Sequence, residues 1–382
     1  MPRPEKTCEK TAGESRSEGA VGRSVEMRPI AIDLFSGCGG LTLGLKQAGF
    51  RVIGAVDNDP LSVETYKLNH RNMVVWDQDI ETLKVRVVKR GLGIRKGELD
   101  LLAGCPPCQG FSTMRTLNGA YPVDDPRNDL VFEFLKFVRG LLPKAVMMEN
   151  VPGLASDGRM EYFCEELRRL GYDYEFRVLN AARYGVPQRR RRMILLAGRF
   201  GSVPFAPQAE CVRTVRDAIK GLPPPGCSGD GLHDLGEART SRIVELIRKI
   251  PKDGGSREDL GPGAQLACHQ TFDGFKDVYG RMAWDAPAPT ITGGFVNPSK
   301  GRFLHPEQDR TITLREAALL QSFPPKYRIS LRRGKFPAAL LIGNALPPEF
   351  VKRHAQEVRI YLRQAAGSRV RRSRGADHAN NR

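Results

Sequence analysis

Residues 28–57 read RPIAIDLFSGCGGLTLGLKQAGFRVIGAVD, and this stretch decides the fold class. Its apolar start, residues 29–34, predicts a buried strand, and the FSGCGG that follows predicts a tight glycine turn. Leucines three to four apart in LTLGLKQAGF, closed by Gly49, predict a helix with a glycine stop. A second strand, RVIGAVDND, comes next. The order of strand, glycine turn, helix and strand is typical of a doubly wound parallel sheet.

Downstream of this unit, short apolar runs continue to alternate with helical patterns. The runs predict a helix over 61–69, strands over 73–76 and 99–104, a helix within 129–142, a strand that ends at Asn150, and two further strands over 174–179 and 192–197. We therefore expect an α/β protein whose mostly parallel sheet is covered by helices on both faces.

The composition of the sequence changes after Gly198, where segments such as PPPG, KDGG and GPGAQ interrupt any periodic pattern of apolar residues. We interpret residues 201–289 as a second, smaller and irregular module. Helical patterns return in LREAALLQSF and in PPEFVKRHAQEVRIYL. The sequence is thus predicted to begin with a disordered tail over 1–27 and a main domain over 28–200, followed by the irregular module over 201–289. A hinge and return segment over 290–335 comes next, and a C-terminal helix over 336–362 completes the main domain. A basic disordered tail over 363–382 ends the chain.

The chain of 382 residues carries a formal net charge of +17, from 60 Lys and Arg against 43 Asp and Glu. Such a field attracts polyanions, nucleic acid first, unless the basic residues are scattered or confined to tails. The last twenty residues hold six Arg and form either a solvated tail or a phosphate-binding arm. No apolar run predicts a signal peptide or a membrane contact, and eight irregularly spaced Cys predict a cytoplasmic protein with reduced thiols.

The glycine turn and two acidic residues suggest a nucleotide-like ligand. A turn without Cβ atoms lets the backbone approach a ligand closely, although many glycine turns are purely structural. Asp57, at the end of the second strand, lies where such folds place a carboxylate on ribose hydroxyls, and Asp79 follows the third strand. Both aspartates are also compatible with simple turn or helix-capping roles, Asp79 more so than Asp57.

The segment GCPPCQGFS also follows a strand, at the sheet edge where ligands bind. A zinc site would need two more ligands, and no second close Cys pair supplies them. A redox pair and a buried structural thiol both remain open at this point. Glu149, in MENV, ends the next strand. In QRRRR, over 188–192, alternation along the following strand should turn Arg190 and Arg192 to the same side.

Taken in order, FSGCGG, VDND, PPCQGFS, MENV, QRRRR and IGNALPP resemble the motif series of the DNA cytosine-5 methyltransferase family, of the bacterial type. The resemblance covers residues 28–199 and 286–362, and the stretch between them is similar to the variable target-recognition region of the family. The DPPY and SPPY motifs of amino-methylating relatives are absent. Asp57 stands where many members carry Glu, which gives its side chain a shorter reach.

This resemblance implies a class I, Rossmann-like methyltransferase that acts on a flipped-out cytosine within a specific sequence of double-stranded DNA. Cys108 is implied as the thiolate that adds to carbon 6, with Cys105 passive beside it. Glu149 is implied to hold or donate a proton at the ring nitrogen. Arg192, with Arg190 as a second candidate, is implied to contact the carbonyl oxygen of the base.

The resemblance also implies S-adenosyl-L-methionine as the cofactor, and no metal. The residues implied to bind it are Phe35, Gly37, Cys38, Gly39, Asp57, Asp79, Pro106 and Asn344. Residues 110–128 are expected to close over the base, and 201–289 to read the target sequence. We expect a monomer that can share its DNA site with a cognate restriction endonuclease without direct contact.

Three rival functions remain open at the level of sequence. One branch of the same family methylates transfer RNA with the same motifs, although a recognition region of about ninety residues favours DNA. A catalytically silent DNA-binding regulator would keep the fold but has no need of intact PCQ and ENV. A nucleotide-dependent oxidoreductase is suggested by the glycine turn alone.

Overall fold

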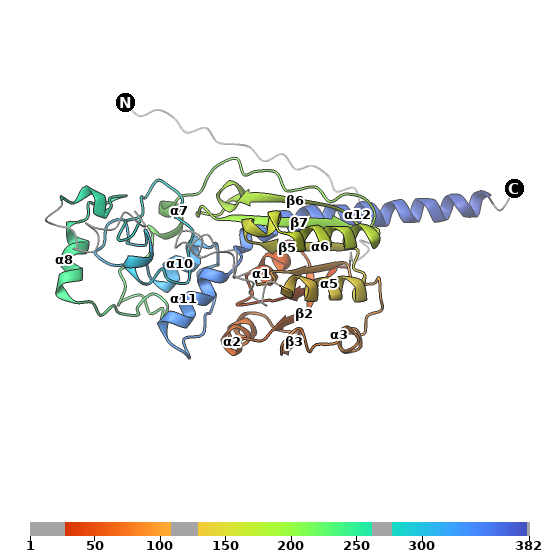
Figure 1. The fold of residues 1–382 in the computed structure, drawn as a ribbon, viewed down its shortest axis with the longest axis horizontal. Helices are drawn as coiled ribbons and strands as arrows, with labels where there is room; N and C mark the ends of the chain where they lie inside the picture. Colours follow the sequence, from red (N-terminus) through yellow and green to blue (C-terminus); the bar gives the residue numbers. More distant parts are fainter. Residues whose placement is uncertain (1–26, 108–128, 262–276, 380–382) are drawn as a thin grey trace, which may run out of the picture.

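The computed structural model describes residues 27–107, 129–261 and 277–379, and Figure 1 shows two adjoining bodies. The larger body is built on a seven-stranded sheet in the order β3-β2-β1-β4-β5-β7-β6. The strands are β1 (Ile30–Leu34), β2 (Arg51–Asp57), β3 (Val74–Asp77), β4 (Leu101–Gly104), β5 (Ala145–Asn150), β6 (Asp173–Asn180) and β7 (Arg191–Gly198). The predicted mostly parallel α/β sheet is thereby confirmed.

One strand breaks the parallel arrangement, and it matters for the site. Strands β1 to β5 pair in parallel, whereas β7 lies antiparallel between β5 and β6. The register places Glu149 opposite Ile194 and Asn150 opposite Met193. The first residues of β7 therefore lie beside the last residues of β5, at the sheet edge where β1 and β4 also end.

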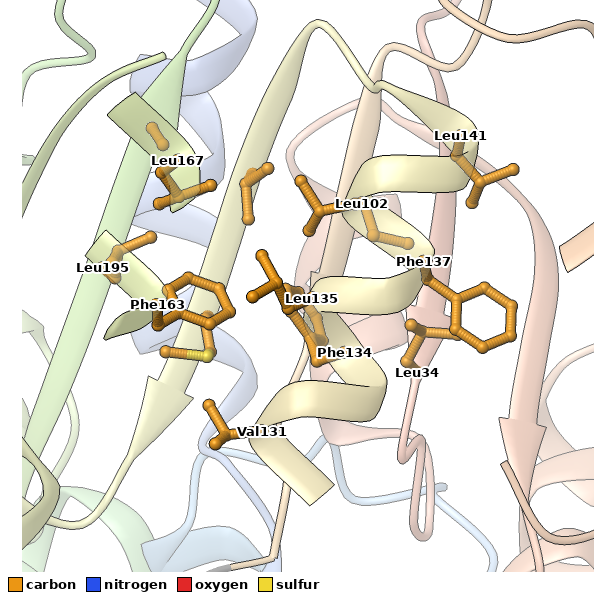
Figure 2. Packing of buried hydrophobic residues seen from close by; sticks show 14 of the residues in the cluster. Leu34, Leu102, Val131, Phe134, Leu135, Phe137, Leu141, Phe163, Leu167 and Leu195 are labelled. Atoms are coloured by element: carbon orange, nitrogen blue, oxygen red, sulfur yellow. The ribbon is translucent and has the colours of Figure 1, made fainter. Parts of the chain in front are cut away.

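Helices cover both faces of this sheet. They are α1 (Gly40–Gln47), α2 (Pro60–Asn69), α3 (Val85–Leu92), α5 (Leu130–Leu141), α6 (Gly158–Arg169) and α12 (Pro348–Ala379), with short 3₁₀ turns at Pro152–Ser156 and Ala181–Tyr184. On one face, Phe134 and Leu135 of α5 pack over Leu102 of β4, with Phe163 of α6 beside them (Figure 2). On the other face, α1 and α12 pack together over the sheet.

The sequence did not predict α3 and α6. Helix α6, GRMEYFCEELRR, buries only Met160, Phe163, Cys164 and Leu167, so its apolar stripe is narrow within a charged segment. In α3 only Val88 is buried. Both helices thus bury only a few side chains against the sheet body.

The smaller body has short elements: α7 (Val215–Ile219), α8 (Ser241–Lys249), α10 (Leu314–Leu320), α11 (Lys335–Asn344) and 3₁₀ turns at Arg257–Asp259 and Pro298–Lys300. One apolar cluster joins residues 215–232 to residues 282–345, and it also includes Cys38 and Leu61 of the larger body. Apolar side chains that are far apart in the sequence pack together here, and with buried polar contacts they stabilise the irregular chain.

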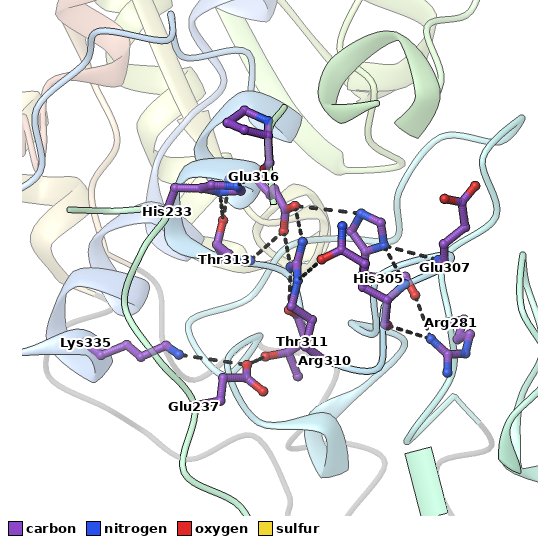
Figure 3. Close-up of polar contacts among 12 residues, drawn as sticks. His233, Glu237, Arg281, His305, Glu307, Arg310, Thr311, Thr313, Glu316 and Lys335 are labelled. Atoms are coloured by element: carbon purple, nitrogen blue, oxygen red, sulfur yellow. Dashed lines mark hydrogen bonds and ion pairs between the residues drawn. The ribbon is translucent and has the colours of Figure 1, made fainter. Parts of the chain in front are cut away.

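Buried polar side chains form a second framework inside the smaller body (Figure 3). Arg310 makes two hydrogen bonds to the carboxylate of Glu316, each of 2.7 Å. Arg281, which is fully buried, donates to the carbonyl oxygens of residues 247, 250, 305 and 308 and to Asp309. A guanidinium has five donors in a fixed fork, so these bonds give the irregular chain a defined shape.

The C-terminal tail differs from its expected irregular form. Helix α12 spans 32 residues and continues through residues 363–379, where it projects beyond the sheet in Figure 1. Arg, Gln and Ala are strong helix formers, and extending a helix that already exists needs no new nucleation. In the ranges that the structure describes, every helix is too short or too polar to cross a lipid bilayer.

Candidate active site

The glycine turn between β1 and α1 combines open and crowded backbone. Phe35, Gly37 and Gly39 have positive φ angles of 59°, 52° and 92°. A Cβ atom on Gly37 would meet nothing within 4 Å, whereas one on Gly40 would lie 2.4 Å from the carbonyl oxygen of Leu346. The chain that follows α11 therefore packs against the turn at Gly40, whereas the space beside Gly37 is free of atoms from other described residues.

Asp57 and Asp79 are brought to the same edge. Asp57 accepts hydrogen bonds from the backbone N–H of Gly37 at 2.7 Å and of Asp59 at 3.0 Å. Burial raises the pKa of Asp57. Asn58 donates to Asp79 across the ends of β2 and β3 at 3.3 Å. Asp57 thus holds the glycine turn itself, and each of its oxygens keeps a second lone pair for a ligand.

Two buried polar atoms, one in the strand before the turn and one in the turn itself, have no hydrogen-bond partner among the described residues: Asp33 Oδ1 and Ser36 Oγ. The other oxygen of Asp33 accepts from the hydroxyl of Thr42 at 2.7 Å. Burial raises the pKa of Asp33 to about 7. With Asp57 close by, the floor of the turn is an acidic environment that suits a positively charged ligand.

Replacing Asp33 with asparagine should stabilise the fold more at pH 8 than at pH 5. A carboxyl whose folded-state pKa is about 7, against an ordinary 3.8, costs the native protein stability as pH rises from about 4 to about 7. At 1.36 kcal/mol for each unit of pKa difference, the cost reaches up to about 4 kcal/mol. Urea unfolding of the Asp33→Asn variant and the wild type at both pH values measures it, and equal gains at the two pH values would contradict a buried titrating carboxyl.

At the other part of the same edge, Glu149 and Arg192 form an ion pair. Arg192 Nε lies 2.8 Å from Glu149 Oε1, and their side chains are only 16% and 10% exposed. The antiparallel pairing of β5 and β7 creates this contact, because it sets the end of one strand beside the start of the other.

The arginines of QRRRR alternate as expected. Arg189 and Arg191 are exposed, whereas Arg190 is 2% exposed and Arg192 is half-buried. Arg190 donates to the carbonyl oxygen of Ile291 at 3.1 Å, and its Nε has no partner within the described part of the chain. Burial and the neighbouring charge of Arg192 lower the pKa of Arg190, while Glu149 opposes the effect. Arg192 alone pairs with the Glu149 carboxylate, and Arg190 is a second buried charge nearby.

The strand end that leads to Cys108 lies beside this pair. Cys105 contacts Glu149, and burial together with that carboxylate raises the pKa of the Cys105 thiol. Asn150 donates to the carbonyl oxygen of Pro106 at 3.0 Å, which ties β5 to the chain just before Cys108. Cys108 and the predicted closing loop over 110–128 lie outside the described residues. The sequence did not single out Asn150, although it directly follows Glu149.

Gln188 is a second residue that the sequence did not single out. Its amide is fully buried; Oε1 accepts from the N–H of Ile291 at 2.9 Å, and Nε2 donates to Gln321 at 3.0 Å. The backbone N–H of Arg189 donates to Ala288 at 2.8 Å. This seam, residues 187–190 against 288–291, fastens the arginine segment to the smaller body.

Asn344, from IGNALPP, ends α11 with an exposed side chain, two residues before the Leu346 carbonyl that packs on Gly40. The structure thus places Asn344 close in sequence to a contact with the glycine turn. No group of three His, Cys, Asp or Glu side chains within residues 27–107, 129–261 and 277–379 is arranged to hold a metal ion.

Comparisons with known proteins agree with this geometry. The model of the C-5 cytosine-specific DNA methylases matches residues 30–359. Type II methylase M.HgiDII of Herpetosiphon aurantiacus is 35% identical in an alignment of 347 positions that covers 87% of this chain and 95% of that protein. Type II methyltransferase M.XorII of Xanthomonas oryzae pv. oryzae is 34% identical, over 84% of this chain and 82% of its own.

Solved structures share the fold. An E. coli prophage protein described as a DNA modification methyltransferase superposes with a TM-score of 0.68 at 23% identity, covering 88% of this chain and 99% of its own. The S. pombe Dnmt2 methyltransferase gives a TM-score of 0.55 at 19% identity, covering 87% and 98%.

Proposed function

The chain belongs to the C-5 cytosine-specific DNA methylase family, and on that premise we propose that Cys108 and the Glu149–Arg192 pair carry out its methyl transfer. The enzyme is a DNA cytosine-5 methyltransferase that uses S-adenosylmethionine, which supplies an electrophilic methyl group when bound. The observation that best supports these residue roles is the largely buried Glu149–Arg192 ion pair beside the strand end that leads into PPC.

Cytosine carbon 5 is a poor nucleophile, so electrons must first enter the ring. In the proposed reaction the Cys108 thiolate adds to carbon 6 of the flipped-out base, and negative charge develops at the ring nitrogen and the carbonyl oxygen. Glu149 holds a proton at that nitrogen, and Arg192 donates to the oxygen. Once carbon 5 carries the methyl group, its proton leaves and the Cys108 sulfur is expelled.

Arg190 is proposed to help stabilise the negative charge that develops on the base, without touching the base itself. Its guanidinium is buried next to Glu149 and Arg192, and its bond to the carbonyl of Ile291 keeps it in place. In a site with little water, a fixed cation stabilises developing negative charge without reorganising during the reaction. We assign Arg192 the direct contact with the base and Arg190 the role of a nearby fixed charge.

The turn residues fit a cationic cofactor. Gly37 presents open backbone, Asp57 is partly exposed with free lone pairs, and Asp33 lies buried beneath with one oxygen unpartnered. We propose that Phe35, Gly37, Cys38, Gly39, Asp57, Asp79, Pro106 and Asn344 hold S-adenosylmethionine, with the carboxylates on its hydroxyl and amino groups.

Recognition of the target sequence is proposed for residues 201–289, with 290–335 as the return segment. Within the predicted 336–362 segment, only the part from Leu346 to Leu362 packs on the sheet body and completes the catalytic domain, because α11 packs in the smaller body. The relatives named Type II methyltransferases support a further proposal, that this enzyme marks the site of a cognate restriction endonuclease without touching it. The cytoplasmic location and the monomeric state stay predictions.

Duplex DNA should accept labelled methyl groups from this enzyme, and transfer RNA should accept none above background. The reason is that a flipped base is read inside a duplex held by the smaller body. Incubation of each nucleic acid with radiolabelled cofactor measures the difference, and bisulfite sequencing of the DNA identifies the target site. Preferential labelling of transfer RNA would reject the DNA assignment.

A further inference from the structure

Two side chains from distant parts of the sequence hold neighbouring carbonyl groups of the glycine turn. The hydroxyl of Tyr327 donates to the carbonyl oxygen of Cys38 at 2.6 Å. His70 Nε2 lies 3.1 Å from the carbonyl oxygen of Gly39 and 3.0 Å from the Tyr327 hydroxyl. His70 follows α2 in the larger body, whereas Tyr327 follows α10 in the smaller one. The turn is therefore held from both bodies at once.

The hydrogen bonds of this group have one consistent set of directions. Tyr327 has a single hydroxyl proton, which it donates to Cys38, so its oxygen accepts from His70. The one proton on His70 Nε2 is therefore shared between the Tyr327 oxygen and the carbonyl oxygen of Gly39. The other nitrogen, Nδ1, then carries a lone pair, and Lys46 Nζ donates to it across 3.3 Å. Burial and the charge of Lys46 hold the pKa of His70 down at about 4, so the ring is neutral near pH 7.

The chain around Tyr327 has little freedom to move away. Asn69 and Arg328 exchange two hydrogen bonds, of 2.7 Å and 2.9 Å, between the Asn69 amide and the Arg328 backbone. The N–H of Ser330 donates to Thr65 at 3.0 Å. The side chains of His70 and Tyr327 are each 4% exposed. These contacts fasten residues 327–330 along α2, directly beside the turn.

Fixing a carbonyl fixes the whole planar peptide to which it belongs, including the N–H on the opposite side. The carbonyls of Cys38 and Gly39 belong to the peptide units that lead into α1, whose N-terminal N–H groups have no partner within the helix. From this geometry we infer that His70 and Tyr327 are positioning residues that pre-organise the glycine turn for S-adenosylmethionine. The inference rests on the proposed role of that turn as the cofactor site.

A pre-organised turn affects cofactor affinity more than the chemical step. Without the Tyr327 hydroxyl, the turn must be ordered when the ligand binds, and that ordering weakens binding. Loss of one such hydrogen bond predicts an increase of about five- to tenfold in the Kd and KM for S-adenosylmethionine. The kcat at saturating cofactor should stay within about twofold, because neither side chain contacts the reacting atoms.

Tyr172 provides a matched control for Tyr327. It is 3% exposed, and its hydroxyl also donates to a backbone carbonyl oxygen, that of Pro143, at 2.5 Å. Pro143 leads into β5 at the end opposite Glu149, away from the glycine turn. Tyr327→Phe and Tyr172→Phe therefore remove the same kind of buried bond and should lower the Tm to a similar extent.

The experiment titrates the full-length protein with S-adenosylmethionine and with S-adenosylhomocysteine by calorimetry, followed by steady-state kinetics on duplex DNA. Tyr327→Phe should weaken both ligands five- to tenfold, while Tyr172→Phe should bind them as the wild type does. His70→Gln, whose amide can donate to Gly39 and accept from Lys46, should retain more affinity than His70→Leu.

Two results would overturn the inference while leaving the function intact: wild-type cofactor affinity in Tyr327→Phe and His70→Leu, or an equal loss of affinity in Tyr172→Phe. If the Tyr327→Phe variant fails to fold, the cofactor affinities of His70→Gln and His70→Leu test the inference instead, and equal affinities in the two would overturn it. A wild-type protein that binds neither ligand would instead reject the cofactor site itself, and the positioning role with it.

Discussion

Replacing Cys108 with serine is expected to abolish methyl transfer, with kcat lowered by at least about 10⁴-fold, while duplex DNA still binds. A serine hydroxyl holds its proton much more tightly than a thiol, so no comparable nucleophile forms to attack carbon 6. Binding persists because phosphate contacts from basic side chains supply most of the affinity for DNA. Transfer of radiolabelled methyl groups measures the first effect, and a gel-shift titration at fixed salt measures the second.

Cys105→Ser separates the two thiols of GCPPC. Cys105 contacts Glu149, and burial raises its pKa, so its sulfur stays protonated and is a poor nucleophile. We expect this variant to keep kcat within about tenfold of the wild type, because it leaves the proposed nucleophile in place. Activity retained in Cys108→Ser but lost in Cys105→Ser would mean that the nucleophile has been misassigned.

The second large effect is expected for Glu149→Gln, with kcat lowered about 10²- to 10⁴-fold. The amide oxygen of glutamine can still accept from Arg192 Nε, which lies 2.8 Å from the carboxylate in the wild type. The variant therefore keeps the contact between β5 and β7 but can no longer hold a transferable proton. Single-turnover methylation of duplex DNA measures the loss of rate.

A matched variant tests whether the effect of Glu149→Gln is chemical. Glu166→Gln also removes a carboxylate paired with an arginine, Arg139, but near the C-terminal end of α6 rather than at the strand ends that carry the candidate site. It should leave kcat unchanged, because Glu166 lies outside the candidate site and contacts none of its residues. A Glu149→Gln enzyme with wild-type kcat would exclude Glu149 from proton transfer.

The sheet could be predicted from the sequence because its strands are short apolar runs bounded by Gly, Asp and Asn. The predicted strands over 73–76, 174–179 and 192–197 differ from β3, β6 and β7 by one residue at their ends. What the pattern could not give was the antiparallel direction of β7. The direction of β7 depends on how β6 connects to it, and the local composition of a strand does not indicate its direction.

The site could be predicted only in part. Motif order pointed to Glu149, Arg190 and Arg192, and the structure gathers these three side chains at one sheet edge. His70 and Tyr327 left no local signal, because the residues that meet are 257 positions apart and neither lies in a recognisable motif. The roles of all these residues stay predictions until the variants are measured.

The seam between residues 187–190 and 288–291 limits where the recognition regions of two such enzymes can be exchanged. Gln188 and Arg190 both bond to the backbone of Ile291, so this residue of the smaller body is fastened to the catalytic body, although it follows the predicted recognition region. A chimera should therefore be joined upstream of Ala288, with this enzyme's own 288–291 retained. A donor segment that shifted the backbone at position 291 would break both bonds and leave the Arg190 guanidinium buried without its partner. Such a hybrid would lose activity for reasons unrelated to the DNA sequence that it reads.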